Sequence, residues 1–359
     1  MDQMEFGDLA RRYKNFYAPN YQILVGGEDV FKKFLIEISS VTVEDTLEGA
    51  DRFSFSINDP EVRWVDSTLF EPGTEVAIKM GYADKLATLI VGEIISLRPT
   101  FPATGTPGLE ISGYDLSYQF TRVRKHRSFE NSRDSDIVAG IANEAKHKLK
   151  TQIDQTETVH PHLVQDRQTD FDFIKGLADR NFFEFFVRER TLYFQRPKRD
   201  QTEILTLVYG ESLSSFNPEL NTAHQVSEVT VRGWNPKTRE EIVGRARRGS
   251  EEARAGGRRS GGDIVETQYG VVEERILDRP VYTQQEADTL ARSALNRRSE
   301  GLIGGNAECI GIPEIRAGQT IKLEGLGKKF SRRYYIESST HTISNAGYST
   351  TFNIKENTI

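Results

Sequence analysis

Residues 20–114 alternate apolar and polar side chains with a period of two. The alternation is regular over 53–57, 76–80 and 109–111, and Asn-Asp-Pro and Glu-Pro-Gly turn sequences separate the runs. Such a pattern indicates antiparallel strands that bury one face and expose the other. Several short strands of this kind favour a barrel or a strongly curved sheet. We therefore expect a first tube-like β-barrel domain over residues 1–119.

The spacing of apolar residues becomes helical after this region. Apolar side chains recur at helical intervals over 135–149, and a second helix is expected to begin near Thr169, where Asp172 completes a capping box. Apolar runs on either side of an Arg-Glu-Arg turn then predict a β-hairpin over 183–195. Together these elements predict a small α/β insert domain over 120–202.

Strand patterns return in residues 203–359. They cover 204–209, 226–234 and several runs within 320–354, and a third helix is expected over about 283–299 behind a Thr-x-x-Glu capping box. We expect a second tube-like β-barrel domain here, with this helix inside it. The predicted fold class is therefore mainly β (α+β), with two tube-like antiparallel β-barrel domains, a small α/β insert and a helix in the second barrel.

The segment 244–262 differs in composition from everything around it. It holds six glycines and six arginines and no large apolar residue. That composition predicts a mobile loop. Its arginines could contact nucleic acid, but no aromatic residues interleave for base stacking. The favoured interpretation is a loop that becomes ordered only against a neighbouring subunit or tube.

A weak internal repeat links the two expected barrels. The stretch from Gly73 to Gly81 reads Gly-Thr-Glu-Val-Ala-Ile-Lys-Met-Gly, and the stretch from Gly318 to Gly325 reads Gly-Gln-Thr-Ile-Lys-Leu-Glu-Gly. Each precedes a hairpin-like β pattern near the end of its domain. Two β-domains of one type, separated by the α/β insert, would explain the repeat.

Composition narrows the functional class. The 359 residues carry 47 basic and 53 acidic side chains, a net charge of −6, whereas a duplex-DNA-binding protein usually has a basic excess. Cys309 is the one cysteine, so an intrachain disulfide and a cysteine-based metal site are excluded, as expected for assembly in a reducing cytoplasm. The charged N-terminus does not resemble a signal peptide, and no apolar run approaches a membrane span.

Four short motifs suggest chemistry but fit structural roles better. His160-Pro161-His162 lacks a third ligand for a metal, and the glycine spacing in 325–329 fails the phosphate-loop pattern and predicts a β-turn with exposed lysines. The aspartates of 166–172 lack the glycine and glutamate of a calcium loop. Glu251-Glu252 falls in the expected mobile loop, which is a poor support for catalytic geometry. We expect no catalytic residues, no metal and no cofactor.

Six strings of the sequence resemble the phage late control protein D family, in family order across roughly 110–354. This family of tail and baseplate hubs is related to the hub portion of valine-glycine repeat protein G. The strings are Ser112–Tyr118 (SGYDLSY), Asp134–Val138 (DSDIV), Gln165–Phe173 (QDRQTDFDF), Val226–Thr238 (VSEVTVRGWNPKT), Arg279–Asp288 (RPVYTQQEAD) and Gly325–Ile336 (GLGKKFSRRYYI) followed by Thr340-His-Thr342. The first hundred residues fit the family only as a β-domain.

The resemblance implies a non-enzymatic structural hub. Three copies with two tube-like barrels each would form a pseudo-sixfold ring, an adaptor between a hexameric inner tube and a trimeric spike. The expected partners are two further copies of the chain, a separate spike protein, an inner tube or tube-initiator protein, and baseplate wedge proteins, without stable nucleic-acid binding. Assembly in the bacterial cytoplasm and incorporation into a phage tail or an extracellular contractile particle are expected.

Interface positions are predicted at the turns 233–238 and 325–333 and in the arginine-rich segment. The predicted interface residues are Trp234, Asn235, Lys237, Arg247, Arg248, Lys328, Lys329 and Arg332. The phenylalanines of 182–186 are expected to pack in the core. The alternative function is a tail-tip protein that binds or degrades peptidoglycan.

Overall fold

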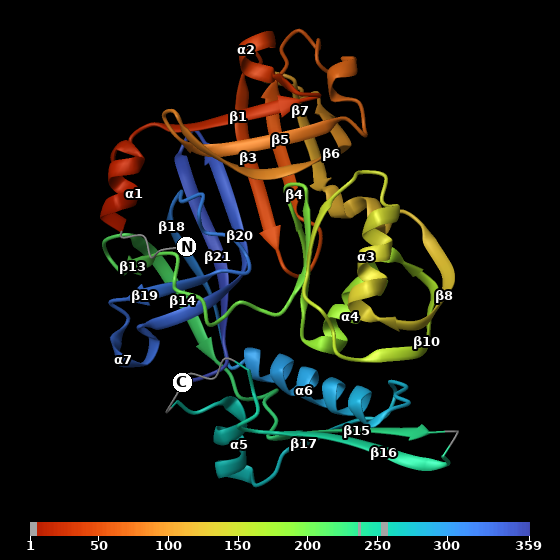
Figure 1. The fold of residues 1–359 in the computed structure, drawn as a ribbon. Coiled ribbons are helices and arrows are strands. Elements are labelled where there is room, and N and C mark those ends of the chain that lie inside the picture. Colours follow the sequence, from red (N-terminus) through yellow and green to blue (C-terminus); the bar gives the residue numbers. More distant parts are fainter. Residues whose placement is uncertain (1–5, 236–237, 253–257) are drawn as a thin grey trace.

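One 13-stranded sheet runs through the computed structural model, which describes residues 6–235, 238–252 and 258–359. Its strands follow the order β14-β18-β21-β20-β3-β4-β7-β6-β5-β1-β2, and β19 and β13 extend from β20. The sheet thus joins strands from the N-terminal and C-terminal parts of the chain (Figure 1). The prediction of a mainly β fold is confirmed.

The elements of the N-terminal half and of the insert follow in chain order. The N-terminal half comprises α1 (Phe6–Arg12), β1 (Pro19–Val25), β2 (Glu28–Asp29), α2 (Val30–Phe34), β3 (Ile38–Thr46), β4 (Arg52–Asn58), β5 (Glu75–Tyr82), β6 (Lys85–Thr100) and β7 (Gly108–Asp115), with short 3-10 turns at Lys14–Phe16, Thr68–Phe70 and Leu116–Thr121. The insert comprises β8 (Arg124–Arg133), α3 (Asp134–Glu144), β9 (Lys150–Ile153), β10 (Val159–Thr169), α4 (Asp170–Asn181), β11 (Glu184–Arg188) and β12 (Thr191–Gln195).

The C-terminal half returns to the large sheet after a detour. It comprises β13 (Thr206–Val208), β14 (Leu213–Leu220), β15 (Glu228–Asn235), β16 (Glu240–Arg247), α5 (Gly261–Tyr269), β17 (Glu273–Ile276), α6 (Gln284–Glu300), β18 (Ile303–Ile310), β19 (Thr320–Glu324), α7 (Gly327–Phe330), β20 (Arg332–Ser344) and β21 (Gly347–Glu356).

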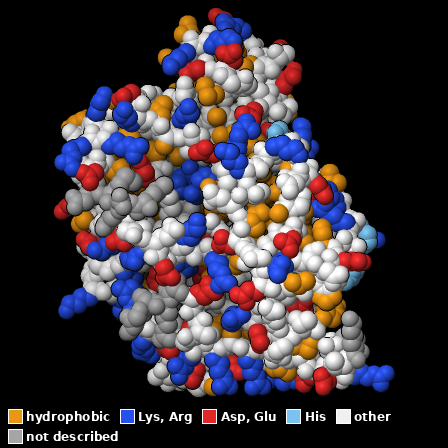
Figure 2. Space-filling model, viewed as in Figure 1, with side chains coloured by type: hydrophobic (Ala, Val, Ile, Leu, Met, Phe, Trp, Pro, Cys, Tyr) orange, Lys and Arg blue, Asp and Glu red, His pale blue; other side chains and the backbone are white. Residues whose placement is uncertain are grey.

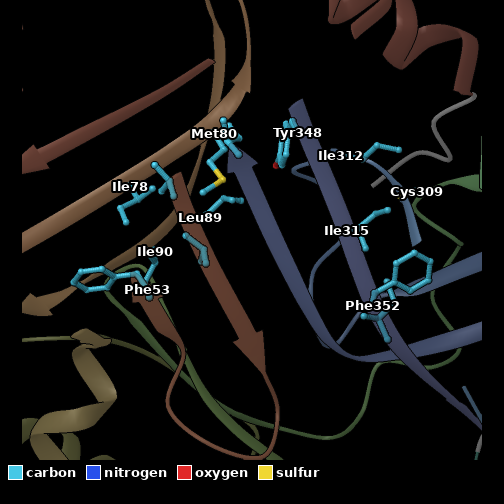
Figure 3. Packing of buried hydrophobic residues seen from close by; sticks show 14 of the residues in the cluster. Phe53, Ile78, Met80, Leu89, Ile90, Cys309, Ile312, Ile315, Tyr348 and Phe352 are labelled. Atoms are coloured by element: carbon cyan, nitrogen blue, oxygen red, sulfur yellow. The ribbon is translucent and has the colours of Figure 1, made fainter. Parts of the chain in front are cut away.

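Both halves contribute to one hydrophobic core. The inward positions that the alternation predicts, such as Phe53 and Ile78, are about 1% exposed or less. They belong to the same buried cluster as Ile312, Phe352 and the other C-terminal residues labelled in Figure 3. Burial of apolar area on this scale is the main favourable term in folding, so the two halves stabilise each other.

The two halves repeat the same strand order. The order β3-β4-β7-β6-β5-β1 in the N-terminal half corresponds to β14-β18-β21-β20-β19-β13 in the C-terminal half. Gly73 and Gly318, which begin the two copies of the sequence repeat, both have positive φ (+91° and +78°). Each donates its N–H to an isoleucine carbonyl, Ile94 at 2.8 Å and Ile336 at 2.9 Å.

β-Bulges fall at matching places in the two halves. β6 is irregular between Ile94 and Ser96 against β7, and β20 is irregular between Ile336 and Ser338 against β21. The β3–β4 pair and the β14–β18 pair carry a second matching irregularity, after Ile38 and Leu213 respectively. One difference is direction, because β1 pairs antiparallel with β5 whereas β13 pairs parallel with β19. The chain therefore contains two versions of one β unit.

The insert forms its own small core beside the N-terminal half. Helices α3 and α4 pack with the sheet β11-β12-β9, and a two-stranded ribbon of β8 and β10 lies alongside. Thr169 caps α4 by accepting a hydrogen bond from the Asp172 N–H at 3.0 Å. The phenylalanines at 182–186 are buried, as predicted.

A further layer covers the end of the molecule near α6. The sheet β16-β15-β17 packs one face on α6, and α5 follows β16 in the chain (Figure 1). Thr283 and Glu286 form the predicted capping box at the start of α6. These elements are inserted between β14 and β18 of the large sheet.

The prediction of a loop over 244–262 is wrong at both of its ends. Residues 244–247 finish β16, in which Ile242, Gly244 and Ala246 are buried. A Cβ at Gly244 would collide with the backbone of Ala287, so this glycine permits close packing of α6. At the other end Ser260 caps α5. The centre of the segment, 253–257, lies outside the described residues.

Candidate assembly interface

The two halves of the chain meet edge to edge through β3 and β20. Residues 40–46 of β3 pair antiparallel with residues 338–344 of β20. Thr42 and Thr342, which face each other across the ladder, lie with their Oγ1 atoms 3.4 Å apart. This junction makes two β units into one continuous sheet, so it shows how such units associate laterally.

A buried ion pair between Asp45 and Arg316 stabilises the junction. Asp45 of β3 accepts hydrogen bonds from the Arg316 guanidinium and from the Ala317 N–H, and Arg188 of the insert lies 4.0 Å away. Burial raises the pKa of Asp45, but the charges of Arg316 and Arg188 offset this effect and hold the pKa below its usual range. Asp45 is therefore ionised and links three parts of the chain.

Two further buried aspartates, Asp51 and Asp115, have pKa values that are raised rather than lowered. Burial, together with the negative charge of Asp45, raises the pKa of Asp51 well above its usual range. Burial also raises the pKa of Asp115 to about 7. Asp115 accepts hydrogen bonds from the Ser117 hydroxyl and N–H, and Asp51 accepts one from the Thr46 N–H. Both carboxyls thus accept hydrogen bonds from nearby backbone N–H groups and stabilise the local turns.

His341 of β20 is buried in the same region. Burial, followed by the nearby positive charge of Arg316, lowers its pKa to about 4, so the imidazole is neutral at pH 7. Its Nε2 lies 3.0 Å from the Ile315 carbonyl, which requires that nitrogen to donate, and its Nδ1 accepts from the Tyr348 hydroxyl at 3.0 Å. His341 therefore orders the junction as a neutral hydrogen-bonding group.

A second buried ionic contact ties the insert to α6. His160 of β10 has its Nε2 3.0 Å from Asp134 and its Nδ1 2.8 Å from Glu286. Burial lowers the pKa of His160, but the two carboxylates more than offset this and raise that pKa to about 9. His162, by contrast, is exposed. In the described residues no group of three or more His, Cys, Asp or Glu side chains is placed to hold a metal ion.

A surface pocket lies at the seam between the N-terminal half and the insert. It has a volume of about 520 Å³ and is lined by residues of β6, α3 and the turn after β7. Two of its acidic side chains form ion pairs within the insert, Asp170 with Lys125 at 2.7 Å and Glu144 with Arg127 at 2.7 Å. Across the seam, Glu93 of β6 lies 2.6 Å from the His147 Nε2 of the insert.

The predicted interface residues are spread over separate surfaces. Trp234 and Asn235 lie at the end of β15, where Trp234 is 55% exposed, and Lys237 lies outside the described residues. Arg247 binds Glu228 at 3.0 Å, and Arg248 binds Asp263 at 3.0 Å and Glu266 at 2.7 Å. These two arginines stabilise the β15–β16–α5 layer.

The other predicted positions lie on and after α7. Lys328 and Lys329 are exposed on this short helical turn, where a β-turn was predicted. The prediction that Arg332 is an interface residue is corrected, because its side chain is buried and donates to the Thr358 carbonyl at 2.7 Å. In Figure 1 α7 and the tip of the β15–β16 hairpin lie at opposite sides, so these residues do not form one surface.

Sequence reasoning missed two exposed strand edges. Among the described residues, 96–100 of β6 pair only with β7, and 215–220 of β14 pair only with β18. The signal was present in the repeat around Gly73 and Gly318, because that repeat implies that each strand of one half has a counterpart in the other.

Charged residues of both signs are interspersed over the face shown in Figure 2, which gives no uniform basic surface there.

Comparison with solved structures identifies the fold. A 43 kDa tail protein of prophage MuSo2 from Shewanella oneidensis has a TM-score of 0.72 at 13% identity, with 94% of this chain and 98% of that chain covered. A tail protein from Neisseria meningitidis MC58 has a TM-score of 0.71 at 13% identity, with 95% and 97% covered. The expected likeness to tail and baseplate hubs is thereby confirmed in the fold.

A secretion-system protein shares this architecture. The E. coli c3393 protein, described as a type VI secretion component similar in structure to the T4 tail proteins gp27 and gp5, has a TM-score of 0.61 at 11% identity, with 93% and 76% covered. No curated protein matches the chain significantly. The family described as Alg8 N-terminal domain matches residues 17–345, so the chain belongs to that family and has the fold of tail proteins from phages and secretion systems.

Proposed function

We propose that this chain is the structural hub of a contractile tail or injection machine, in which three copies form a ring between a sixfold inner tube and a threefold spike. The observation that carries the proposal is the duplicated β unit, with the same strand order and matching bulges in both halves. Three chains with two such units each present six similar units around an axis. Duplication inside the chain thus resolves the symmetry mismatch between tube and spike.

The lateral contact between β3 and β20 supports this arrangement. It shows that two of these units associate side by side through strand edges, with their cores merged into one cluster. A ring repeats that kind of contact between neighbouring chains. The likeness of the fold to tail proteins and to a secretion-system component agrees with this role.

The role that we propose is mechanical and involves no catalysis. In the pocket at the seam, Asp170 and Glu144 are ion-paired and Glu93 contacts His147. The buried Asp45, Asp51 and Asp115 bind groups of their own chain. A glycan hydrolase needs two carboxyls that face a shared substrate. The proposed partners are a spike protein, an inner tube or tube-initiator protein and baseplate wedge proteins, within a virion or an extracellular particle. No helix in the described part of the chain has the length and apolar character that a membrane crossing needs.

Native mass spectrometry and electron microscopy of the purified protein test the proposal. We expect a particle of three times the chain mass, alone or on addition of the spike protein, and a threefold ring with an axial opening in projection. A protein that remains monomeric with and without the spike, or that forms a twofold particle, would refute the hub assignment. Release of fragments from purified peptidoglycan would favour the alternative function.

A further inference from the structure

In the part of the chain that the structure describes, two strand edges of the large sheet carry apolar residues and have no partner strand on their outer side. The outer part of β6 is exposed at Arg98, Pro99 and Thr100, and Phe101 directly after it is 62% exposed. The outer part of β14 is exposed at Glu219 and at Leu220, which is 37% exposed. Exposed strand edges with apolar residues associate with other strands unless something covers them.

The structure itself shows which strands fit these edges. β6 is the counterpart of β20. In each strand an isoleucine, Ile94 or Ile336, accepts a hydrogen bond from the N–H of a positive-φ glycine, and a β-bulge directly follows that isoleucine. β14 is the counterpart of β3, because both pair with equivalent neighbours and carry their bulges at equivalent places. Within the chain β20 and β3 pair with each other through their outer edges. The equivalent outer edges of β6 and β14 have no such partner among the described residues.

We propose that β6 of one copy of the chain pairs antiparallel with β14 of the next copy, in the register that β20 and β3 adopt within the chain. The pairing of Thr340 with Glu44 inside the chain corresponds to a pairing of Arg98 with Glu219 of the next copy. The resulting pairs between copies are Leu97 with Leu220, Arg98 with Glu219, Pro99 with Pro218, Thr100 with Asn217 and Phe101 with Phe216.

The chemistry of the facing residues supports this register, which was derived from backbone equivalence alone. Arg98 meets a carboxylate of opposite charge, and its present contact with Glu110 is a distant 3.9 Å with the arginine 73% exposed. Leu97 and Leu220 cover each other, as do Phe101 and Phe216. Shifting the register by two residues would bring Arg98 opposite Asn217 or Asn221 and would separate the phenylalanines.

The prolines add a second constraint on the register. Pro99 and Pro218 lack an N–H and are tolerated on sheet edges but disfavoured in the middle of a ladder. In the proposed register they face each other, so the two missing N–H donors fall at one position of the ladder. In any other register the two prolines fall at two separate positions, and each would leave a carbonyl of the facing strand without its donor.

The pairing is head to tail, since each copy offers β6 on one side and β14 on the other. Such a contact forms a closed ring when the rotation between copies divides a full turn. The inference deepens the proposed hub function and rests on it for the number of copies. It adds the strands, the register and the residues that join one copy to the next.

Disulfide trapping tests the register directly. The double variant Arg98→Cys/Glu219→Cys places two thiols on facing residues, whose Cβ atoms are about 4.5–5.5 Å apart in a strand pair. We expect covalent multimers on non-reducing gels, up to a closed ring. The off-register variant Arg98→Cys/Asn217→Cys and both single variants serve as controls, and Cys309 does not interfere because it is buried.

Charge reversal provides a second and reversible test. Arg98→Glu and Glu219→Arg each place like charges across the interface, and we expect each to lower the multimer fraction several-fold, whereas the double reversal restores it. Reversing Arg232, which pairs with Glu241 at 2.9 Å across β15 and β16, is the matched control and leaves assembly unchanged. All of these side chains are exposed, so circular dichroism should show an unaltered fold.

The outcomes separate the register from the hub function. Trapping of the Arg98–Glu219 pair and rescue by the double reversal support the inference. A threefold ring that forms with equal trapping of the off-register pair, or with no effect of charge reversal, overturns the inference and leaves the hub function standing. A protein that forms no multimer with or without the spike overturns both.

Discussion

The contact of His160 with two buried carboxylates predicts a stability difference that depends on pH. We consider the variant His160→Gln, which keeps a hydrogen-bond donor and removes the charge. The folded-state pKa of His160 is about 9, against an ordinary value of 6.5. Each pKa unit corresponds to about 1.4 kcal/mol, so the charged histidine contributes about 3 kcal/mol of stability at low pH.

The sign follows from proton linkage. A group whose pKa is raised by folding contributes its full stabilisation below its ordinary pKa and loses it as pH rises through the folded-state value. The contribution of His160 is therefore complete at about pH 6 and lost above about pH 9. At about pH 10 histidine and glutamine are both neutral, so the variant should then cost only about 1 kcal/mol for altered hydrogen bonding.

Urea unfolding monitored by circular dichroism at about pH 6, 8 and 10 provides the measurement. Comparing each variant with the parent protein at the same pH cancels the titration of Asp51, Asp115 and other groups. His162→Gln is the control, since His162 is exposed two residues away on the same strand and should leave stability unchanged. A cost of His160→Gln that stays constant from pH 6 to pH 10 would refute the ionic account.

Two further predictions concern the repeated unit and its junction. Gly73→Ala and Gly318→Ala should each lower stability by about 1–2 kcal/mol in thermal melts, because both glycines have positive φ, whereas Gly140→Ala in α3 should be neutral or stabilising. Arg316→Met should cost about 3–5 kcal/mol, because it removes the hydrogen-bonded cation of the buried Asp45 and leaves only the more distant Arg188. Adding Asp45→Asn should recover part of that loss, and a double variant less stable than the single would contradict this reasoning.

The sequence predicted several elements in which large apolar residues form a buried face or a capping residue marks the start of a helix. The alternation at 53–57 and the capping boxes at Thr169 and Thr283 led to β4, α4 and α6, because burial and capping leave local patterns. The ribbon of β8 and β10 was missed, since most residues on both faces are polar and partly exposed. Alternation of apolar and polar residues does not predict such strands, because neither of their faces is consistently apolar.

Composition misled the prediction where tertiary packing decides. The alternation of buried Gly244 and Ala246 with exposed Arg245 and Arg247 is a strand pattern built from small residues, which suit the close approach of α6. Arg332 was predicted to be an interface residue because it lies in the expected turn 325–333. Its position in register with the buried Tyr334 and Ile336 would have predicted burial on the core side of β20.

The internal and the proposed external junctions differ in a way that fits their roles. At the level where Asp45 faces Ser339 the internal junction buries an ion pair with Arg316, which demands a fixed partner and suits a contact made once, during folding. The equivalent level between copies holds Leu97 and Leu220, which tolerate exposure to water before assembly. The adjacent prolines discourage pairing in other registers, so the same edges that join copies resist indiscriminate aggregation. Duplication followed by divergence at these few positions would thus separate a permanent junction from one that forms on assembly.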